Sequence, residues 1–185
     1  MRQSIYGIIL IALVTISCKR EQDPFEIGKH HVGLLTDSTQ VKDLKAVFPN
    51  DSIVTHTGGD EFMGAKNDYY IFEKGGKKLL VLTPKNALDS TSVIENVQII
   101  DPRYKTVSNI TTQSTFRSIR SYYKISKINN MINTILVSVN ELNATFSIDK
   151  KELPANLRFD MNLNIEETHI PDDAKIKYFF INWNN

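Results

Sequence analysis

His56, Asp60 and Glu61 form the group of side chains whose types and spacing most directly suggest chemistry. An imidazole followed closely by two carboxylates could bind a metal ion or transfer protons. Gly58 and Gly59 between them favour a turn in a polar loop. Three side chains on a glycine-rich loop fix no coordination geometry without partners elsewhere, so we expect a solvated loop and no metal site.

The same loop reads Gly-Gly-Asp-Glu-Phe from Gly58 to Phe62, the five letters that name the diguanylate cyclases. A cyclase needs a nucleotide pocket, a metal site and access to cytoplasmic GTP. Only about forty residues lie between the export signal predicted below and Gly58, too few for the metal-binding strand and the further segment that cyclases place upstream. The sequence therefore predicts that this protein is not a diguanylate cyclase.

Two other groups of polar residues contain potential metal ligands. His30 and His31 are adjacent, and neighbouring side chains on a strand point to opposite faces, so a shared ion is not expected. Residues 166–173, Glu-Glu-Thr-His-Ile-Pro-Asp-Asp, form the densest acidic cluster but lack the alternating oxygen ligands and the glycine of a calcium loop. We expect an acidic turn fixed by Pro171, and we predict no metal and no other cofactor.

A basic group lies further along the chain, interleaved with two tyrosines and spaced at helical intervals: Arg117, Arg120, Lys124 and Lys127. On one face of a helix these side chains would form a basic patch able to meet lipid phosphates, anionic glycans or an acidic partner. The alternative is an ordinary solvated helix face.

Hydrolase signatures are missing from the sequence: it holds no serine nucleophile elbow, no His-Glu-x-x-His helix and no phosphate loop. The serines at 38 and 114 stand where helix caps belong. A non-enzymatic protein is therefore the leading hypothesis. The alternative is an extracytoplasmic hydrolase whose site is assembled from scattered residues such as His56, Asp60 and His169.

The N-terminus is typical of an export signal. Arg2 supplies a positive charge, an apolar run extends from Ile5 to Ile16, and the small Ser17 precedes Cys18. A membrane-spanning helix needs about 20 apolar residues, so this run is too short for a permanent anchor and cleavage is expected. We assign residues 1–17 to a lipoprotein signal peptide.

Cys18 is the only cysteine in the chain, and the stretch Leu-Val-Thr-Ile-Ser-Cys resembles a bacterial lipobox, although threonine stands where leucine is usual. Acylation of this thiol would hold the protein on a membrane without crossing it. Residues 18–28 are polar, contain Pro24 and predict a flexible tether. Lys19 is not the aspartate that retains such proteins at the inner membrane, which favours the outer membrane.

The remaining residues, 29–185, are sufficient for one domain of ordinary size. The formal net charge of +1 argues against a nucleic-acid partner, which would demand a marked basic excess. We therefore expect partners within the cell envelope: a membrane through the lipid anchor, and an envelope protein or an anionic glycan or lipid.

Two segments of the domain share one pattern. Apolar residues at helical spacing follow a cap at Asp37, Ser38 or Thr39 and again at Ser114 or Thr115. Thr39 and Ser114 are about 75 residues apart, and β-prone runs with glycine or polar turns follow each helix. The pattern predicts an α+β fold made of two similar helix-plus-antiparallel-meander units, 29–101 and 102–185, with the helices on one face of the sheet. A chance recurrence of common units is the alternative.

The final run, Ala-Lys-Ile-Lys-Tyr-Phe-Phe-Ile-Asn-Trp at 174–183, is apolar on both faces of a strand. Such a strand usually lies inside a sheet. We predict that it pairs centrally or next to the first unit, with Phe179 and Ile181 on the helix side and Phe180 on the other.

Several short segments, in order, resemble the sigma-E-regulated outer-membrane lipoproteins of Gram-negative bacteria, a domain of unknown function. They are the stretches at 32–39, 72–76, 93–101, 115–116 and 170–183. The resemblance implies an envelope lipoprotein with two similar halves and no assigned enzymatic activity, and it carries over no catalytic residue. Together with the lipobox it predicts a non-enzymatic, lipid-anchored envelope protein whose domain binds another envelope component.

Overall fold

The computed structural model describes residues 22–58 and 66–183. Three predictions lie outside these residues: the signal peptide at 1–17, the acylated Cys18, and the part of the glycine-rich loop that holds Asp60 and Glu61. Within the described part of the chain, no helix is both long and apolar enough to cross a membrane.

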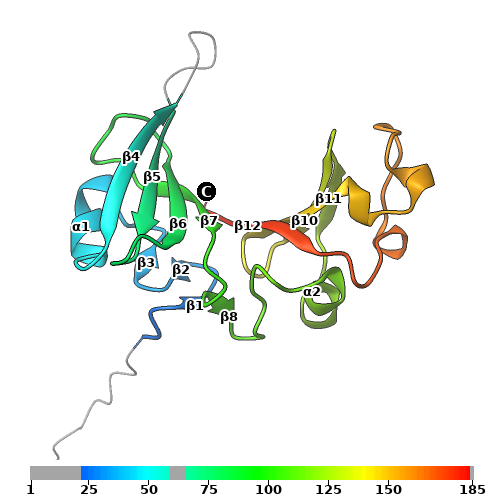
Figure 1. The fold of residues 1–185 in the computed structure, drawn as a ribbon, viewed down its shortest axis with the longest axis horizontal. Coiled ribbons are helices and arrows are strands. Elements are labelled where there is room, and N and C mark those ends of the chain that lie inside the picture. The colour runs from blue at the N-terminus through cyan, green and yellow to red at the C-terminus, as the bar shows by residue number, and fades with distance from the viewer. Residues whose placement is uncertain (1–21, 59–65, 184–185) are drawn as a thin grey trace, which may run out of the picture.

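The described chain is mostly β-structure, arranged in two sheets (Figure 1). The larger sheet is antiparallel, and its eight strands lie in the order β4 (Ser52–Gly58), β5 (Lys66–Phe72), β6 (Lys78–Pro84), β7 (Ile94–Ile99), β12 (Ile176–Asn182), β11 (Ala144–Asp149), β10 (Thr134–Val139) and β9 (Lys127–Asn130). The smaller sheet has four short strands in the order β3 (Leu35–Thr36), β2 (His31–Val32), β1 (Glu26–Ile27) and β8 (Lys105–Thr106).

Helices are few and short. Two α-helices occur in the described residues, α1 (Leu44–Val47) and α2 (Phe116–Tyr122), and α1 continues a 3₁₀ turn, η1 (Val41–Asp43). Three more 3₁₀ turns, η2 (Lys150–Glu152), η3 (Ala155–Leu157) and η4 (Glu167–His169), lie between β11 and β12. The fold is therefore mixed, as predicted, but richer in sheet than the sequence pattern indicated. Pro49 lies just beyond α1, where its ring cannot continue a helix.

The two halves of the chain share a pattern of backbone contacts around their helices. In the first half, the amide of Ile94 donates to the carbonyl of Thr39 at 3.1 Å. In the second, the amide of Ile176 donates to the carbonyl of Ser114 at 3.3 Å. Each contact ties a residue two positions before a helical segment to the last strand of its half. That the halves are two copies of one unit stays a prediction, which these contacts support.

The terminal strand lies where the sequence placed it. β12 pairs with β7 of the first half on one side and with β11 on the other, at the centre of the eight-stranded sheet. Phe179 and Ile181 are fully buried, and the ring of Phe179 lies 4.5 Å from that of Phe146 between centroids. Phe180 is half-buried on the other face. This strand joins the two halves into one continuous sheet.

The smaller sheet begins within the segment that the sequence assigned to the tether. Glu26–Ile27 forms β1, Ile27 is buried, and the carbonyl of Phe25 accepts a hydrogen bond from Lys105 at 2.9 Å. The folded domain therefore starts a few residues earlier than expected. Gly33 has a φ of 57°, and a Cβ at this position would collide with the carbonyl of Pro24. This turn brings the N-terminal segment against the first half of the large sheet.

Candidate functional site

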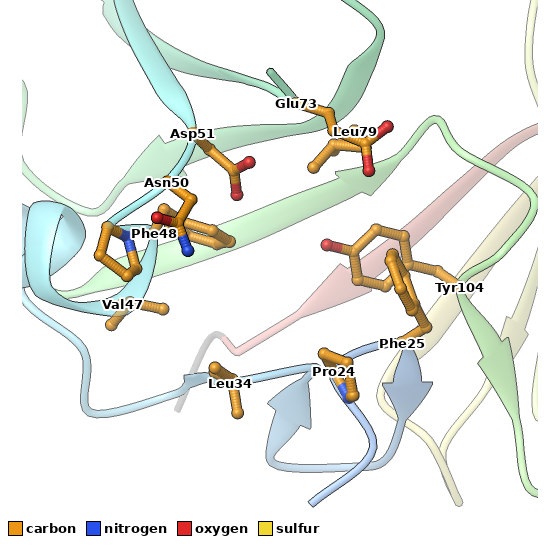
Figure 2. A pocket seen from close by; sticks show the side chains of 11 residues that line it. Pro24, Phe25, Leu34, Val47, Phe48, Asn50, Asp51, Glu73, Leu79 and Tyr104 are labelled. Atoms are coloured by element: carbon orange, nitrogen blue, oxygen red, sulfur yellow. The ribbon is translucent and has the colours of Figure 1, made fainter. Parts of the chain in front are cut away.

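The N-terminal segment forms one wall of an open cavity of about 280 Å³ (Figure 2). The segment at and after the end of α1 forms a second wall, and the β5–β6 turn, β6 and Tyr104, which lies between β7 and β8, complete the cavity. The lining residues are Pro24, Phe25, Leu34, Val47, Phe48, Pro49, Asn50, Asp51, Glu73, Leu79 and Tyr104.

Local turns position the polar residues of this cavity. The amide of Asp51 donates to the carbonyl of Phe48 at 3.3 Å, which brings the chain round after α1. Glu73 begins the β5–β6 turn, where its carbonyl accepts from Gly76 at 2.9 Å. Gly75 and Gly76 have φ values of 112° and 88°, a conformation that residues with a Cβ rarely adopt. The two carboxylates of the lining therefore come from separate turns.

The opposite side of the cavity is aromatic. The rings of Phe25 and Tyr104 meet edge to face with centroids 5.0 Å apart. Phe48 and Tyr104 are buried, whereas Leu34 at the rim is half exposed. Figure 2 shows the hydroxyl of Tyr104 directed towards the space between the carboxylate side and the N-terminal wall. The cavity thus combines an apolar floor with one hydroxyl and a carboxylate edge.

An ion-pair network lies beside the cavity. Arg103 contacts both carboxylate oxygens of Glu73, at 2.8 and 2.9 Å, and its Nη2 lies 2.8 Å from Oδ2 of Asp101. Lys77 also reaches Asp101, at 2.9 Å. The guanidinium carbon of Arg103 stands 4.6 Å from the ring centre of Phe25, so the network is coupled to the aromatic wall.

Asp101 is the buried centre of this network, with no exposed side-chain surface. Burial opposes ionisation of its carboxyl, but hydrogen bonds from Arg103 and Lys77 outweigh that effect and hold the pKa of Asp101 well below its usual range. Hydrogen bonds to Asp101 and Glu73 raise the pKa of Arg103. The network therefore stays ionised.

Asp51 stands apart from this network. Burial and the nearby charge of Glu73 raise the pKa of Asp51, with Arg103 acting in the opposite direction. Among the described residues, Asp51 forms no ion pair within 4.0 Å. Burial, followed by the charge of Asp51, also raises the pKa of the Tyr104 hydroxyl.

The local charges do not balance. Three carboxylates, those of Asp51, Glu73 and Asp101, face two cations, those of Arg103 and Lys77, and both cations are engaged by Glu73 and Asp101. One negative charge beside an aromatic floor therefore has no counterion in the described structure. Such a site can accept a cation that carries an apolar body.

The predicted basic patch is not a helix face. Arg117 and Arg120 do lie on α2, but both contact Asp172, at 3.2 and 2.5 Å. α2 ends at Tyr122, so Lys124 lies beyond it and Lys127 begins β9. The prediction that all four side chains share one helix is therefore wrong, because Tyr123 is already extended. A binding role for these residues stays a prediction.

The structure does not bring together His56 and His169, the two described residues of the predicted hydrolase site. His56 lies on β4, at one edge of the large sheet, and its ring stacks on Tyr70 with centroids 5.5 Å apart. His169 ends η4 in the other half, where Nδ1 accepts a hydrogen bond from the amide of Glu166 at 3.1 Å. Figure 1 places these two elements on opposite sides of the molecule.

The remaining sequence candidates have local partners. His30 Nδ1 lies 2.7 Å from Asp37 Oδ2, and His31 Nε2 lies 3.4 Å from Glu26 Oε1. In the acidic turn, Asp172 is occupied by the two arginines of α2. Within residues 22–58 and 66–183, no cluster of three histidine, cysteine or carboxylate side chains could hold a metal ion.

The cavity beside Asp51 was missed by the sequence reasoning. Its residues come from segments that are distant in the chain, and no short motif joins them. One signal of the site was present in the sequence, since Asp101, Arg103 and Tyr104 come directly after an apolar strand. Charged residues next to buried ones often form a fixed network of ion pairs.

Comparisons with known proteins give a fold likeness only. No protein-family model matches the chain, and no curated protein sequence matches it. Among solved structures, the chain is similar to the crystal structure of the uncharacterized protein yfeY from Escherichia coli, with a TM-score of 0.58 and 10% sequence identity. The similarity covers 85% of this chain and 99% of that one. At this identity the likeness shows a shared fold and carries over no activity or site residue.

Proposed function

We propose that this is a non-enzymatic, lipid-anchored protein of the bacterial outer membrane, whose domain binds another envelope component through the cavity beside Asp51. The observation that carries the proposal is the unpaired, partly buried carboxylate of Asp51 against the aromatic floor of Phe48 and Tyr104. An ionised carboxylate in such a place costs stability, and groups of this kind are common at binding sites.

The chemistry of the cavity favours an amine on an apolar body, such as the side chain of a lysine-like residue in an envelope peptide. The ammonium would neutralise Asp51 and donate to the Tyr104 hydroxyl, while the hydrocarbon part packs on Phe48 and Leu79. The cavity of about 280 Å³ is near the lower limit for small-molecule pockets and suits one side chain.

The position of the cavity is consistent with a partner close to the membrane. Pro24 lines the cavity and is six positions beyond Cys18. A fully extended chain spans about 3.3–3.6 Å per residue, so the cavity wall lies within about 20 Å of the predicted acylated cysteine. An envelope component at the membrane surface is within reach of this site.

Amine binding by the purified protein tests the proposal. The probe is Nα-acetyl-lysine methylamide, titrated against the protein while NMR shifts of the cavity residues are followed, with Nα-acetyl-norleucine methylamide as the uncharged control. We expect shifts around Asp51 and Tyr104 with the lysine probe only. Asp51→Asn should weaken binding about tenfold or more, as loss of a partly buried charge pair does.

Asp43→Asn is the matched control, since it removes the same charge from η1, outside the cavity. It should leave binding unchanged. Binding should also weaken as the pH falls through the raised pKa of Asp51, because only the ionised carboxylate attracts the amine. Equal affinity for both probes, or equal binding by wild type and Asp51→Asn, would reject the proposed site.

We also propose that the two halves of the domain are copies of one helix-and-meander unit. The matching contacts of Thr39 with Ile94 and of Ser114 with Ile176 support this. So does the strand order, in which β4 to β7 of the first half mirror β9 to β12 of the second. Superposing the halves of an experimental structure should bring these four strands and the two helices into register; a fit in only one hairpin would speak against duplication.

A further inference from the structure

A second cavity, of about 540 Å³, lies in the other half of the molecule. The β9–β10 turn, η2, the residue pair after η3 and the start of β12 surround it. In Figure 1 these elements lie on the side of the molecule opposite to β4 and α1. Four basic side chains line this cavity: Lys150, Lys151, Arg158 and Lys177.

Lys150 is the unusual member of this group. It is only 4% exposed, yet its Nζ has no carboxylate within 4.0 Å among the described residues. Among the described side chains, Nζ contacts the thioether sulfur of Met161, a weak acceptor, at 3.8 Å. A buried ammonium without a counterion is costly, and an anion from outside the chain would offset that cost.

The other charges of the cavity do not supply that anion. Asp149 is the single acidic residue of the lining, and its carboxylate is taken by Lys177 at 2.9 Å and by the amide of Lys151 at 3.0 Å. Nε of Arg158 donates to the carbonyl of Leu153 at 2.7 Å, which fixes the guanidinium at the cavity without neutralising it. Four cations and one anion leave an excess positive charge.

The rim of the cavity is strongly apolar. Phe159 is 87% exposed and Ile132 is 73% exposed. Asn130 holds the loop that follows Phe159, since its Nδ2 donates to the carbonyls of Asp160 at 3.0 Å and Leu163 at 2.9 Å. Phe159 therefore lies directly before an anchored loop, whereas Ile132 lies in the β9–β10 turn. Single exposed apolar residues are common, but large ones beside a basic cavity are typical of surfaces that meet lipid.

We infer that this cavity is a binding site for the headgroup of an anionic lipid at a membrane surface. The lipid phosphate completes the ion pairing of Lys150, with Lys151 and Arg158 beside it. Phe159 and Ile132 enter the boundary between headgroups and acyl chains. The charge complementarity selects an anionic headgroup, and the apolar rim selects a lipid in a membrane over a free phosphate. This inference does not depend on the cavity beside Asp51.

Vesicle co-sedimentation tests the inference with a chain that starts at Gln22, which retains every buried core residue, from Ile27 to Trp183. The probes are vesicles of phosphatidylcholine, with and without phosphatidylglycerol. We expect binding only to the anionic vesicles. Lys151→Glu combined with Arg158→Glu should lower the affinity about tenfold or more, because each basic residue near an anionic surface contributes appreciably to binding.

The matched control is Lys42→Glu with Lys45→Glu, the same charge change at exposed positions of η1 and α1, outside the cavity lining. This control should lower the affinity for anionic vesicles clearly less than the cavity variant does. If the two double variants weaken binding equally, only general electrostatic attraction operates and the site is rejected. Thermal unfolding reports whether the Arg158 change disturbs folding. If it does, the single variant Lys151→Glu, at an exposed position, repeats the test.

Phe159→Ser and soluble glycerophosphate separate the lipid from a free anion. The variant should weaken vesicle binding, whereas glycerophosphate at the same phosphate concentration should compete poorly. Glycerophosphate binding as tight as vesicle binding, unchanged by Phe159→Ser, would assign the cavity to a soluble phosphate and overturn the lipid inference. Failure to bind anionic vesicles would overturn it outright.

Discussion

The indole Nε1 of Trp183 donates a hydrogen bond to the backbone carbonyl of Lys29 at 3.0 Å, across 154 positions of sequence. Trp183 directly follows β12, and Lys29 lies between β1 and β2. This contact joins the smaller sheet, which carries one wall of the candidate cavity, to the central strand of the large sheet.

Replacing Trp183 separates the hydrogen bond from the packing. Trp183→Phe keeps most of the buried ring and loses the donor, so we expect a loss of about 1 kcal/mol in the free energy of unfolding. Trp183→Ala should cost about 3–5 kcal/mol, as for other buried aromatic residues. Urea unfolding of both variants gives the two values. No loss in Trp183→Phe would mean that the hydrogen bond does not stabilise the fold, and equal losses in the two variants would mean that packing of the ring does not.

Phe179 is the residue of β12 whose removal should damage the fold most. It is fully buried and packs against Phe146 across the β11–β12 pair. Phe179→Ala should destabilise by about 3–5 kcal/mol, a large part of the roughly 5–15 kcal/mol available to a domain. The exposed Tyr178→Ala on the same strand is the control. Similar unfolding midpoints for the two variants would contradict the central role of this strand.

Asp101→Asn should destabilise the protein at neutral pH, by about 1–3 kcal/mol, because Arg103 and Lys77 lose a buried charged acceptor. The pKa of Asp101 is lowered in the folded state, so its stabilisation is present above the unfolded pKa of about 3.9 and is lost as the pH falls below that value. The difference between wild type and variant should therefore shrink in acid. Chemical denaturation at a series of pH values measures it, and a constant difference would contradict this account.

Asp51→Asn should have the opposite effect and stabilise the protein at neutral pH. The pKa of Asp51 is raised in the folded state, so the fold favours the protonated form, and wild type loses stability as the pH rises through that range. The gain in the variant should vanish once the pH is low enough to protonate Asp51. Asp43→Asn should show no such pH dependence. A variant less stable than wild type at pH 7 would show that Asp51 has a partner that stabilises its charge.

Cys18→Ala should abolish acylation and leave only the weaker contact proposed for the basic cavity, because the acyl chains supply nearly all of the attachment expected from the sequence. Metabolic labelling with a palmitate analogue should mark wild type and fail to mark the variant. Replacing Asp60 and Glu61 with Ala should leave labelling intact. Labelling of Cys18→Ala would refute the lipobox assignment.

Periodic features of the sequence were the ones that predicted structure well. β12 was recognisable because a strand that is apolar on both faces must be covered on both. The burial of Phe116 and Ile119 followed from their helical spacing, although no side-chain hydrogen bond caps α2. The second helix was predicted too long, since Lys124 and Lys127 continued the spacing of charges although the backbone is already extended at Tyr123. Charge spacing on a surface is a weak constraint compared with packing.

The sequence by itself determined which strands would be buried and that the chain would carry two helix-and-strand segments, because periodicity reports which side of each element must leave water. Only the tertiary structure decided which polar groups meet. Asp51 lacks a counterion because Arg103, which is distant from it in sequence, forms its ion pairs with Glu73 and Asp101. Lys150 is buried in the packed structure, where its Nζ contacts Met161 from the segment between η3 and η4. Both cavities depend on such long-range contacts, whose charges and burial arise only when separate segments are packed together.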